Sequence, residues 1–254
     1  MKTTITNRKG QKIVVLLDLV KNQKGLAFVM HGLGGFKEEL HIHTFANAFN
    51  EKGYSAVRFD TTNTVGESDG KYEDATITNY YADLEDVIAW AKEQKWYQEP
   101  FCLAGHSLGG ICTALYAENH PEKVKALAPI SAVVSGKLSA EAYGKKRLEN
   151  WEKTGWEIRP STSKPGLIKK LKWSHMRDRM KYGLLTKVDK LKMPVLIIVG
   201  DQDDRTPLQH QKILFDKLPG RKEMYVIKGA GHVFREKLHL DEIKKIFLKW
   251  IDTL

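Results

Sequence analysis

The chain has 254 residues, of which 42% are hydrophobic, and its formal net charge is +10. A chain of this length buries roughly 70–75% of its unfolded surface in one core, so one domain with a small insertion is expected. The apolar run at residues 13–17 lies between Lys12 and Asp18 and has no cleavage pattern after it, which predicts a strand and not a signal peptide. No stretch approaches the roughly 18 uncharged apolar residues of a membrane span. These features argue against a membrane-spanning protein, and a cytoplasmic location is expected.

Short β-branched runs alternate with amphipathic stretches along the chain, which is typical of a mostly parallel sheet with helices on both faces. The predicted strands are 12–18, 26–30, 54–59, 100–104, 124–129, 195–199 and 223–227. The predicted helices are 38–52, 78–95, 108–119, 208–218 and 240–254. The two cysteines, Cys102 and Cys112, fall within a strand and a helix of this pattern, which favours buried thiols over a disulfide framework.

One segment, residues 131–188, breaks this alternation because it has no strand-length β-branched run. Between residues 136 and 190 there are 15 Lys or Arg against 6 Asp or Glu, which places +9 of the net charge there. We interpret residues 131–188 as an inserted lid, with helical patches at 140–151 and 167–182 flanking a Pro- and Ser-containing loop at 159–166. Residues 1–130 and 189–254 would then form the core domain.

A candidate nucleophile lies at the turn between a strand and a helix. Residues 105–109 read Gly-His-Ser-Leu-Gly, with an apolar strand before them and a helical pattern after them. A Gly-x-Ser-x-Gly sequence in this context predicts a nucleophile elbow, in which larger side chains at Gly105 and Gly109 would collide with their neighbours. Ser107 would be exposed at the apex of the turn, in a strained conformation at a helix N-terminus.

A serine hydroxyl needs an imidazole to accept its proton and a carboxylate to orient that imidazole. His232 follows a Gly-Ala-Gly sequence after the last predicted strand, which makes it the candidate base. The acid is expected just after strand 195–199, where Asp201, Asp203 and Asp204 are available. Spacing favours Asp203, Asp204 is the alternative, and Asp201 is typical of turn chemistry.

The loop after strand 26–30 reads His-Gly-Leu-Gly-Gly at residues 31–35. Such a glycine-rich loop can direct backbone N–H groups toward an oxyanion, and the predicted donors are the amides of Leu33 and Leu108. His31 is interpreted as a structural loop residue and not as a second base.

These four motifs, in this order, resemble the α/β-hydrolase superfamily over essentially the whole chain. Within it, Arg58-Phe59-Asp60 followed by residues 66–73 is similar to bacterial feruloyl (cinnamoyl) esterases and their serine-peptidase-like relatives. The resemblance implies an α/β-hydrolase fold with an inserted lid and an aryl or short-chain ester as the small-molecule substrate. Residues 61–65 depart from the Gly-His-Gly-like sequence common in such relatives.

The predicted reaction is carboxylic ester hydrolysis through a covalent acyl-enzyme. A thioesterase, a lysophospholipase or monoacylglycerol lipase, or a peptidase would use the same three residues, and a ligand-binding receptor on the same fold is the non-enzymatic alternative. Neither a cofactor nor a metal is expected, and no nucleic-acid-binding motif accompanies the positive charge. A homodimer is compatible with the sequence.

The lid offers two open interpretations. Its aromatic residues could line an acyl or aryl pocket, or they could anchor the lid to the sheet; they are Trp151, Trp156 and Trp173, with Tyr143, Met176 and Met180 nearby. Its basic residues could attract an anionic substrate or form a solvated face.

Overall fold

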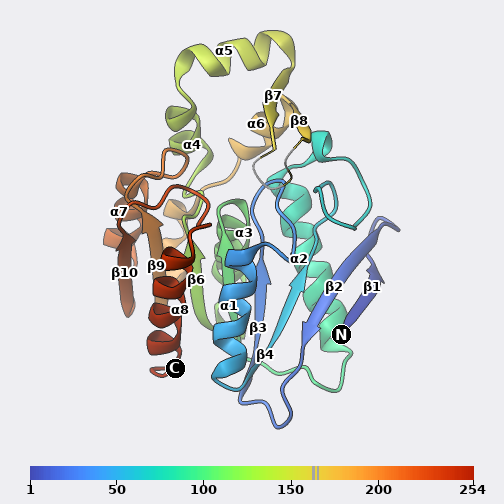
Figure 1. Cartoon of the computed structure of the whole chain (residues 1–254), viewed down its shortest axis with the longest axis vertical. Helices are drawn as coiled ribbons and strands as arrows, with labels where there is room; N and C mark the ends of the chain where they lie inside the picture. The colour runs from blue at the N-terminus through green and yellow to red at the C-terminus, as the bar shows by residue number, and fades with distance from the viewer. Residues whose placement is uncertain (162–163, 165) are drawn as a thin grey trace.

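The computed structural model describes residues 1–161, 164 and 166–254. Within these residues, eight strands form one sheet in the order β1-β2-β4-β3-β5-β6-β9-β10 (Figure 1). The strands are β1 (Lys2–Thr6), β2 (Lys12–Asp18), β3 (Gly25–Met30), β4 (Tyr54–Phe59), β5 (Phe101–His106), β6 (Val124–Ile130), β9 (Val195–Gly200) and β10 (Lys222–Ile227). β2 pairs antiparallel with β1 and β4, whereas the sheet from β4 to β10 is parallel.

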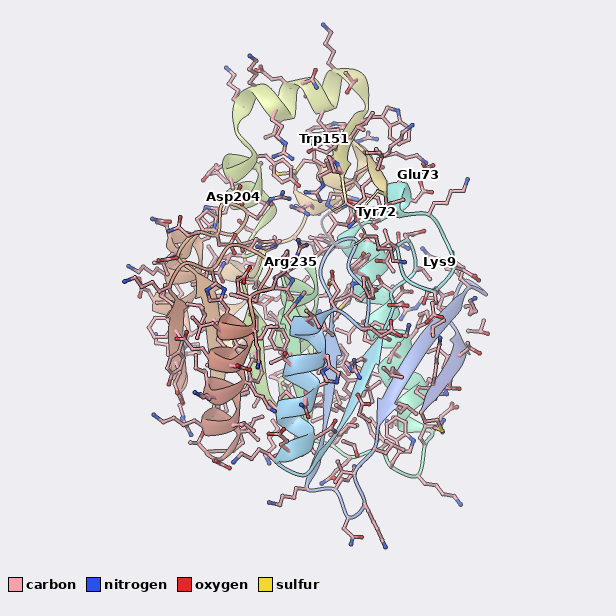
Figure 2. The ribbon with its side chains drawn as sticks, viewed as in Figure 1. Lys9, Tyr72, Glu73, Trp151, Asp204 and Arg235 are labelled. Carbon is pink, nitrogen blue, oxygen red and sulfur yellow. The ribbon has the colours of Figure 1, made fainter. Side chains whose placement is uncertain are left out.

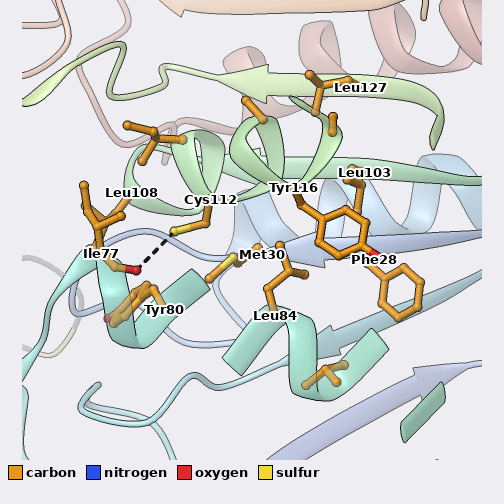
Figure 3. Close-up of a cluster of buried hydrophobic side chains, with 14 of the residues drawn as sticks. Phe28, Met30, Ile77, Tyr80, Leu84, Leu103, Leu108, Cys112, Tyr116 and Leu127 are labelled. Carbon is orange, nitrogen blue, oxygen red and sulfur yellow. Dashed lines mark hydrogen bonds between the residues drawn. The ribbon is translucent and has the colours of Figure 1, made fainter. Parts of the chain in front are cut away.

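Alternate side chains of the central strands point to opposite faces of the sheet and build two separate cores. On one face, Phe28 and Leu103 pack against α2 and α3 (Figure 3). On the other face, Val29 and Ala104 pack against α1 and α8. The helices are α1 (Leu40–Glu51), α2 (Ile77–Lys92), α3 (Leu108–Asn119), α7 (Leu208–Lys217) and α8 (Lys237–Ile251). The predicted α/β-hydrolase architecture is confirmed.

All seven predicted strands are present, but the sequence analysis missed β1. This edge strand reads Lys-Thr-Thr-Ile-Thr, and Ile5 is its buried side chain. An edge strand with one buried apolar residue has too little hydrophobic alternation to be recognised from sequence.

Residues 131–188 connect the neighbouring strands β6 and β9 and rise above the end of the sheet in Figure 1. Their elements are α4 (Gly136–Tyr143), α5 (Lys145–Thr154), β7 (Trp156–Pro160), β8 (Ile168–Lys172), α6 (Ser174–Arg179) and the short 3₁₀ turn Leu184–Thr186. A second 3₁₀ turn, Val188–Lys190, follows at the end of the segment. The helical patch expected at 140–151 is divided by Gly144, which has a positive φ of 78°.

Although the segment has no strand-length β-branched run, it contains two strands, and β7 and β8 form an antiparallel hairpin. The helix expected over 167–182 is correspondingly limited to α6. The buried positions of the hairpin include Glu157 and Lys169, while Ile158 and Ile168 are exposed. Because charged residues occupy the inner face, the usual apolar alternation is absent from the sequence. Of the predicted loop, Thr162, Ser163 and Pro165 lie outside the described residues.

Among the described helices, none is long and apolar enough to cross a membrane.

The last turn of α3 contains a buried acidic side chain, Glu118, whose Oε1 has no hydrogen-bond partner. Burial raises the pKa of its carboxyl to about 8, and the opposing charge of Lys187 offsets only part of this effect. The ionised carboxylate is therefore unfavourable in the folded state.

We expect Glu118→Gln to raise the free energy of unfolding by about 1 kcal/mol above pH 8, or roughly 2–4 °C in Tm. The gain should shrink as the pH falls below 8 and become small below pH 4.5, the ordinary pKa, where the wild-type carboxyl is mostly protonated in both states. Thermal unfolding from pH 4 to 9 measures this, with the exposed Glu122→Gln as the matched control. A gain of equal size at every pH would contradict the explanation.

Candidate active site

Ser107 lies at the tip of the turn that joins β5 to α3. Its φ of 55° and ψ of −111° are unusual for a residue other than glycine. A Cβ at Gly105 would lie 2.4 Å from the Gly109 carbonyl oxygen, and a Cβ at Gly109 would lie 2.5 Å from the His31 carbonyl oxygen. The turn therefore needs both glycines for the steric reason that the sequence motif indicated.

The structure brings Ser107, His232 and Asp203 together. Ser107 Oγ lies 2.8 Å from His232 Nε2, and His232 Nδ1 lies 3.0 and 2.9 Å from the two carboxylate oxygens of Asp203. The three residues come from the β5–α3 turn, the loop after β10 and the loop after β9. All three loops follow the carboxyl ends of parallel strands, which meet at one edge of the sheet.

Asp203 is held by the backbone of its own loop. Its Oδ1 accepts hydrogen bonds from the N–H groups of Arg205 and Thr206, each at 2.9 Å, and the Thr206 hydroxyl lies 2.9 Å from Oδ2. Burial alone would raise the pKa of Asp203, but the hydrogen bonds from His232 and Thr206 outweigh it and lower this pKa below its ordinary value. Asp203 is thus ionised at neutral pH.

The two other aspartates of this loop have different surroundings. Asp201 accepts a hydrogen bond from the Gly229 N–H at 2.7 Å and so links two loops. The side chain of Asp204 is 85% exposed and lies 3.7 Å from Arg205. Neither is hydrogen-bonded to His232 in the described structure, so the geometry favours Asp203.

The loop of residues 31–35 packs directly against the nucleophile turn. A Cβ at Gly32 would be 3.1 Å from the Cβ of Ser107, and Leu33 lines the same pocket as Ser107. Leu108 is the first residue of α3, where a backbone N–H has no partner within the helix. The Leu33 and Leu108 amides remain the predicted oxyanion donors.

His31 is part of the loop framework. Its Nε2 accepts a hydrogen bond from the Thr61 N–H at 3.1 Å, and its Nδ1 lies 2.8 Å from the Gly32 carbonyl oxygen. With both ring nitrogens engaged and the side chain fully buried, His31 has the structural role expected for it.

The sequence analysis missed the contribution of His106. Its Nε2–H donates a hydrogen bond of 2.8 Å to the backbone carbonyl of His232. Burial, followed by the proximity of His232, lowers the pKa of His106 to about 3, so the ring is neutral and holds this carbonyl without competing for the serine proton. An imidazole next to the elbow serine was the available sequence signal.

The pocket at Ser107 encloses about 260 Å³, and its lining combines apolar surface with several charged side chains. Residues 131–188, which we call the inserted segment, contribute to its lining Val133, Tyr143, Arg159, Pro160, Lys169 and Arg179. Asp204 and Arg235, labelled in Figure 2, also line it.

Among the described residues that line this pocket there is no tryptophan. Trp151 is buried in the inserted segment, where its Nε1–H donates to the Leu171 carbonyl and its ring packs on Trp173. Trp156 is partly exposed beside Lys172. The three tryptophans therefore lie outside the described lining of this pocket: Trp151 and Trp173 pack against each other within the segment, and Trp156 is at its surface.

One group of carboxylates away from the pocket has the composition of a cation site. Glu38, Asp60 and Glu67 lie close together, but the buried ammonium of Lys37 lies among them, 2.9 Å from Asp60 and 2.5 Å from Glu67. Lys37 thus supplies the positive charge that this group requires.

With this geometry established, comparison with known proteins identifies the family. The family model for serine aminopeptidase, S33, matches residues 21–164, which include Ser107. The chain belongs to this serine hydrolase family. Asp203 and His232 lie beyond the matched residues, so their place in the site rests on the geometry above.

Solved structures and relatives agree with this family. Est1E from Butyrivibrio proteoclasticus, whose structure was determined with ferulic acid bound, superposes with a TM-score of 0.82 at 27% identity and covers 99% of this chain and 98% of its own. The thermostable monoacylglycerol lipase of Bacillus sp. (strain H-257) is 24% identical over 210 residues, 81% of each chain. An uncharacterised 31.7 kDa protein of Escherichia coli is 26% identical over 239 residues, 82% of each chain. The predicted resemblance to feruloyl esterases is confirmed.

The neighbouring aspartates of this S33 hydrolase allow a matched test of the acid. We expect Asp203→Asn to slow covalent labelling of Ser107 by a fluorophosphonate by about 10³-fold or more, because His232 loses the carboxylate that orients it. Asp204→Asn removes an equal charge from the next position and should change the rate by less than about 3-fold. Equal effects of the two variants would argue against the assignment.

The role of His106 can be separated from simple packing. His106→Leu removes the donor to the His232 carbonyl and should slow fluorophosphonate labelling by about 10-fold or more, whereas His106→Gln, which retains an N–H donor, should recover most of the rate. Labelling rates and Tm are measured together for both variants. If His106→Leu and His106→Gln are labelled equally slowly and have equal Tm values, the hydrogen bond from His106 does not position His232.

Proposed function

We propose that this protein is a carboxylic ester hydrolase in which Ser107, His232 and Asp203 form the catalytic triad. The observation that carries the proposal is the continuous line of hydrogen bonds from Ser107 Oγ through both ring nitrogens of His232 to the Asp203 carboxylate. A binding protein has no need of a serine held in a strained conformation beside an oriented imidazole.

The geometry supports acyl transfer in two steps. His232 Nε2 accepts the Ser107 proton as Oγ attacks the ester carbonyl, and the oxyanion is bound by the amides of Leu33 and Leu108. His232 then protonates the leaving alcohol, which produces a covalent acyl-enzyme on Ser107. Water, deprotonated by the same imidazole, hydrolyses this intermediate. Asp203 remains ionised throughout and stabilises the imidazolium.

The substrate we propose is a short-chain or aryl ester. The compact pocket of about 260 Å³ favours a short acyl group. Est1E, which binds ferulic acid, supports the aryl alternative. Monoacylglycerol is a second candidate because of the relative from Bacillus, and thioesters and peptides would be attacked by the same groups.

Residues 131–188 are proposed to act as the lid over this pocket, with residues 1–130 and 189–254 as the core. The support is the contact of the β7–β8 hairpin with the loop of residues 31–35. Lys169 Nζ donates a hydrogen bond of 2.6 Å to the Gly34 carbonyl, and the neighbouring Lys164 donates one of 2.5 Å to the Val65 carbonyl.

The function is tested with the p-nitrophenyl esters of acetate, butyrate, octanoate and laurate beside methyl ferulate. We expect activity on the short esters or on ferulate, with Ser107→Ala lowering kcat/KM by about 10⁴-fold or more because no other group supplies the nucleophile. Ser174→Ala, in α6 and outside the pocket lining, is the matched control.

Stopped-flow measurement on p-nitrophenyl butyrate gives an independent test of the acyl-enzyme. If deacylation is slower than acylation, a burst of p-nitrophenolate equal to the enzyme concentration is expected, and it should disappear in Ser107→Ala. Turnover that persists in Ser107→Ala would refute the mechanism, and no activity on any of the five esters would refute the proposed substrate class.

A further inference from the structure

The pocket beside Ser107 contains an excess of positive charge. Among the described residues that line it, five are basic and two are acidic. The basic residues are Arg159, Lys169, Arg179, Arg205 and Arg235, and the acidic residues are Glu39 and Asp204. Three of the basic residues come from the inserted segment and have surroundings that distinguish them from an ordinary solvated surface.

Arg179 is only 4% exposed. One of its terminal nitrogens donates to Ser139 Oγ at 2.6 Å, and the other lies 2.8 Å from His175 Nε2. His175 is uncharged, because burial, followed by the charge of Arg179, lowers its pKa well below the ordinary value. The third nitrogen, Nε, is buried and has no hydrogen-bond partner among the described residues. The guanidinium is therefore held in place by neutral groups that leave its charge uncompensated.

Arg159 and Lys169 share this lack of an acidic partner. Arg159 lies 3.4 Å from the Tyr72 hydroxyl, and the Lys169 ammonium is engaged by the Gly34 carbonyl. Within the described part of the chain, no carboxylate oxygen is within 4.0 Å of a side-chain nitrogen of Arg159, Lys169 or Arg179. Elsewhere in the inserted segment, Arg147 and Lys172 each have an acidic partner.

Burying a cation without a counter-charge is unfavourable, and placing several together adds repulsion. Such an arrangement is stabilised when an anion binds between the cations. Because a guanidinium presents paired N–H donors that match the two oxygens of a carboxylate, arginine is well suited to this role.

We propose that the substrate of this enzyme is an ester that also carries an ionised carboxylate, which Arg179 and Arg159 bind while the ester carbonyl lies at Ser107. The inference rests on the proposed ester hydrolysis and specifies its substrate. Lys169 adds positive charge at the pocket while its hydrogen bond to Gly34 joins the hairpin to the loop of residues 31–35. The carboxylate belongs either to the acyl part or to the alcohol part of the ester, and the two cases require different probes.

The acyl case is tested with mono(4-nitrophenyl) glutarate against 4-nitrophenyl pentanoate, which have the same leaving group and chain length. The alcohol case is tested with 4-acetoxybenzoate against phenyl acetate. For each pair, the ratio of kcat/KM for the anionic ester to that for the neutral ester is corrected for the rates of hydroxide-catalysed hydrolysis. We expect a corrected ratio of about 10 or more in one of the two pairs.

The variants are Arg179→Gln and Arg159→Gln, each of which should lower that ratio by about 10-fold or more, whatever happens to the neutral ester. Arg159→Gln makes the test independent of the buried contacts of Arg179. Lys146→Gln removes an equal charge from an exposed position of α5 and should leave the ratio unchanged within about 2-fold. If Lys146→Gln lowers the ratio by the same factor, the preference for the anionic ester comes from the overall positive charge of the segment, and the proposed carboxylate site is wrong.

The outcomes separate the inference from the proposed function. If neutral and anionic esters are both hydrolysed and neither arginine variant changes the ratio of their kcat/KM values, the inference is overturned. Ester hydrolysis as the proposed function then still stands. If no ester is hydrolysed, the proposed function is wrong, and the carboxylate site is then tested by binding. Glutarate should raise the Tm of the Ser107→Ala variant. It should not raise the Tm of the triple variant that also carries Arg179→Gln and Arg159→Gln. No shift with glutarate would overturn the inference.

Discussion

The close approach of two backbone segments at the nucleophile turn is the constraint on which the site depends. At Gly105 and Gly109 the turn packs so tightly against α3 and against the end of β3 that neither position has room for a Cβ. This packing fixes Ser107 in a conformation that places its Oγ beside His232, and it also brings Gly32 against Ser107. The candidate nucleophile and the predicted oxyanion loop are thus positioned by the same contact.

The rest of the site extends outward from this contact through hydrogen bonds to the backbone. His106, which precedes the serine, holds the carbonyl of His232, and the loop after β9 holds Asp203 through its own amides. Most of these supports belong to the core strands and their loops. The first residues of the inserted segment also contribute, because the Ser131 carbonyl accepts a hydrogen bond from the Thr206 hydroxyl and the Val133 N–H donates one to the Ser107 carbonyl. The inserted segment contributes Arg159, Lys169 and Arg179 to the pocket, so the proposed substrate selection and the proposed reactivity depend largely on different parts of the fold.

Local patterns were sufficient to predict much of this arrangement. Seven strands, the elbow and the loop of residues 31–35 each have a signal within a few residues, because period-two alternation and glycine positions reflect local packing directly. The edge strand β1 and the β7–β8 hairpin were missed for related reasons. β1 buries one apolar side chain, and the hairpin places Glu157 and Lys169 on its inner face, so neither shows the expected alternation.

The sequence by itself determined the order of the motifs, the fold class and the identity of Ser107 and His232 as candidates, since each lies in a short stretch whose glycines have a steric purpose. Spacing favoured Asp203 over Asp204, and the tertiary structure supports that preference because the folded loop directs the Asp203 carboxylate at His232 and leaves Asp204 exposed. Only the tertiary structure shows that the tryptophans of the inserted segment lie outside the described pocket lining and that Arg159 and Arg179 are part of it. Those outcomes depend on how a hairpin with a charged inner face packs on loops distant in sequence, which no local pattern encodes.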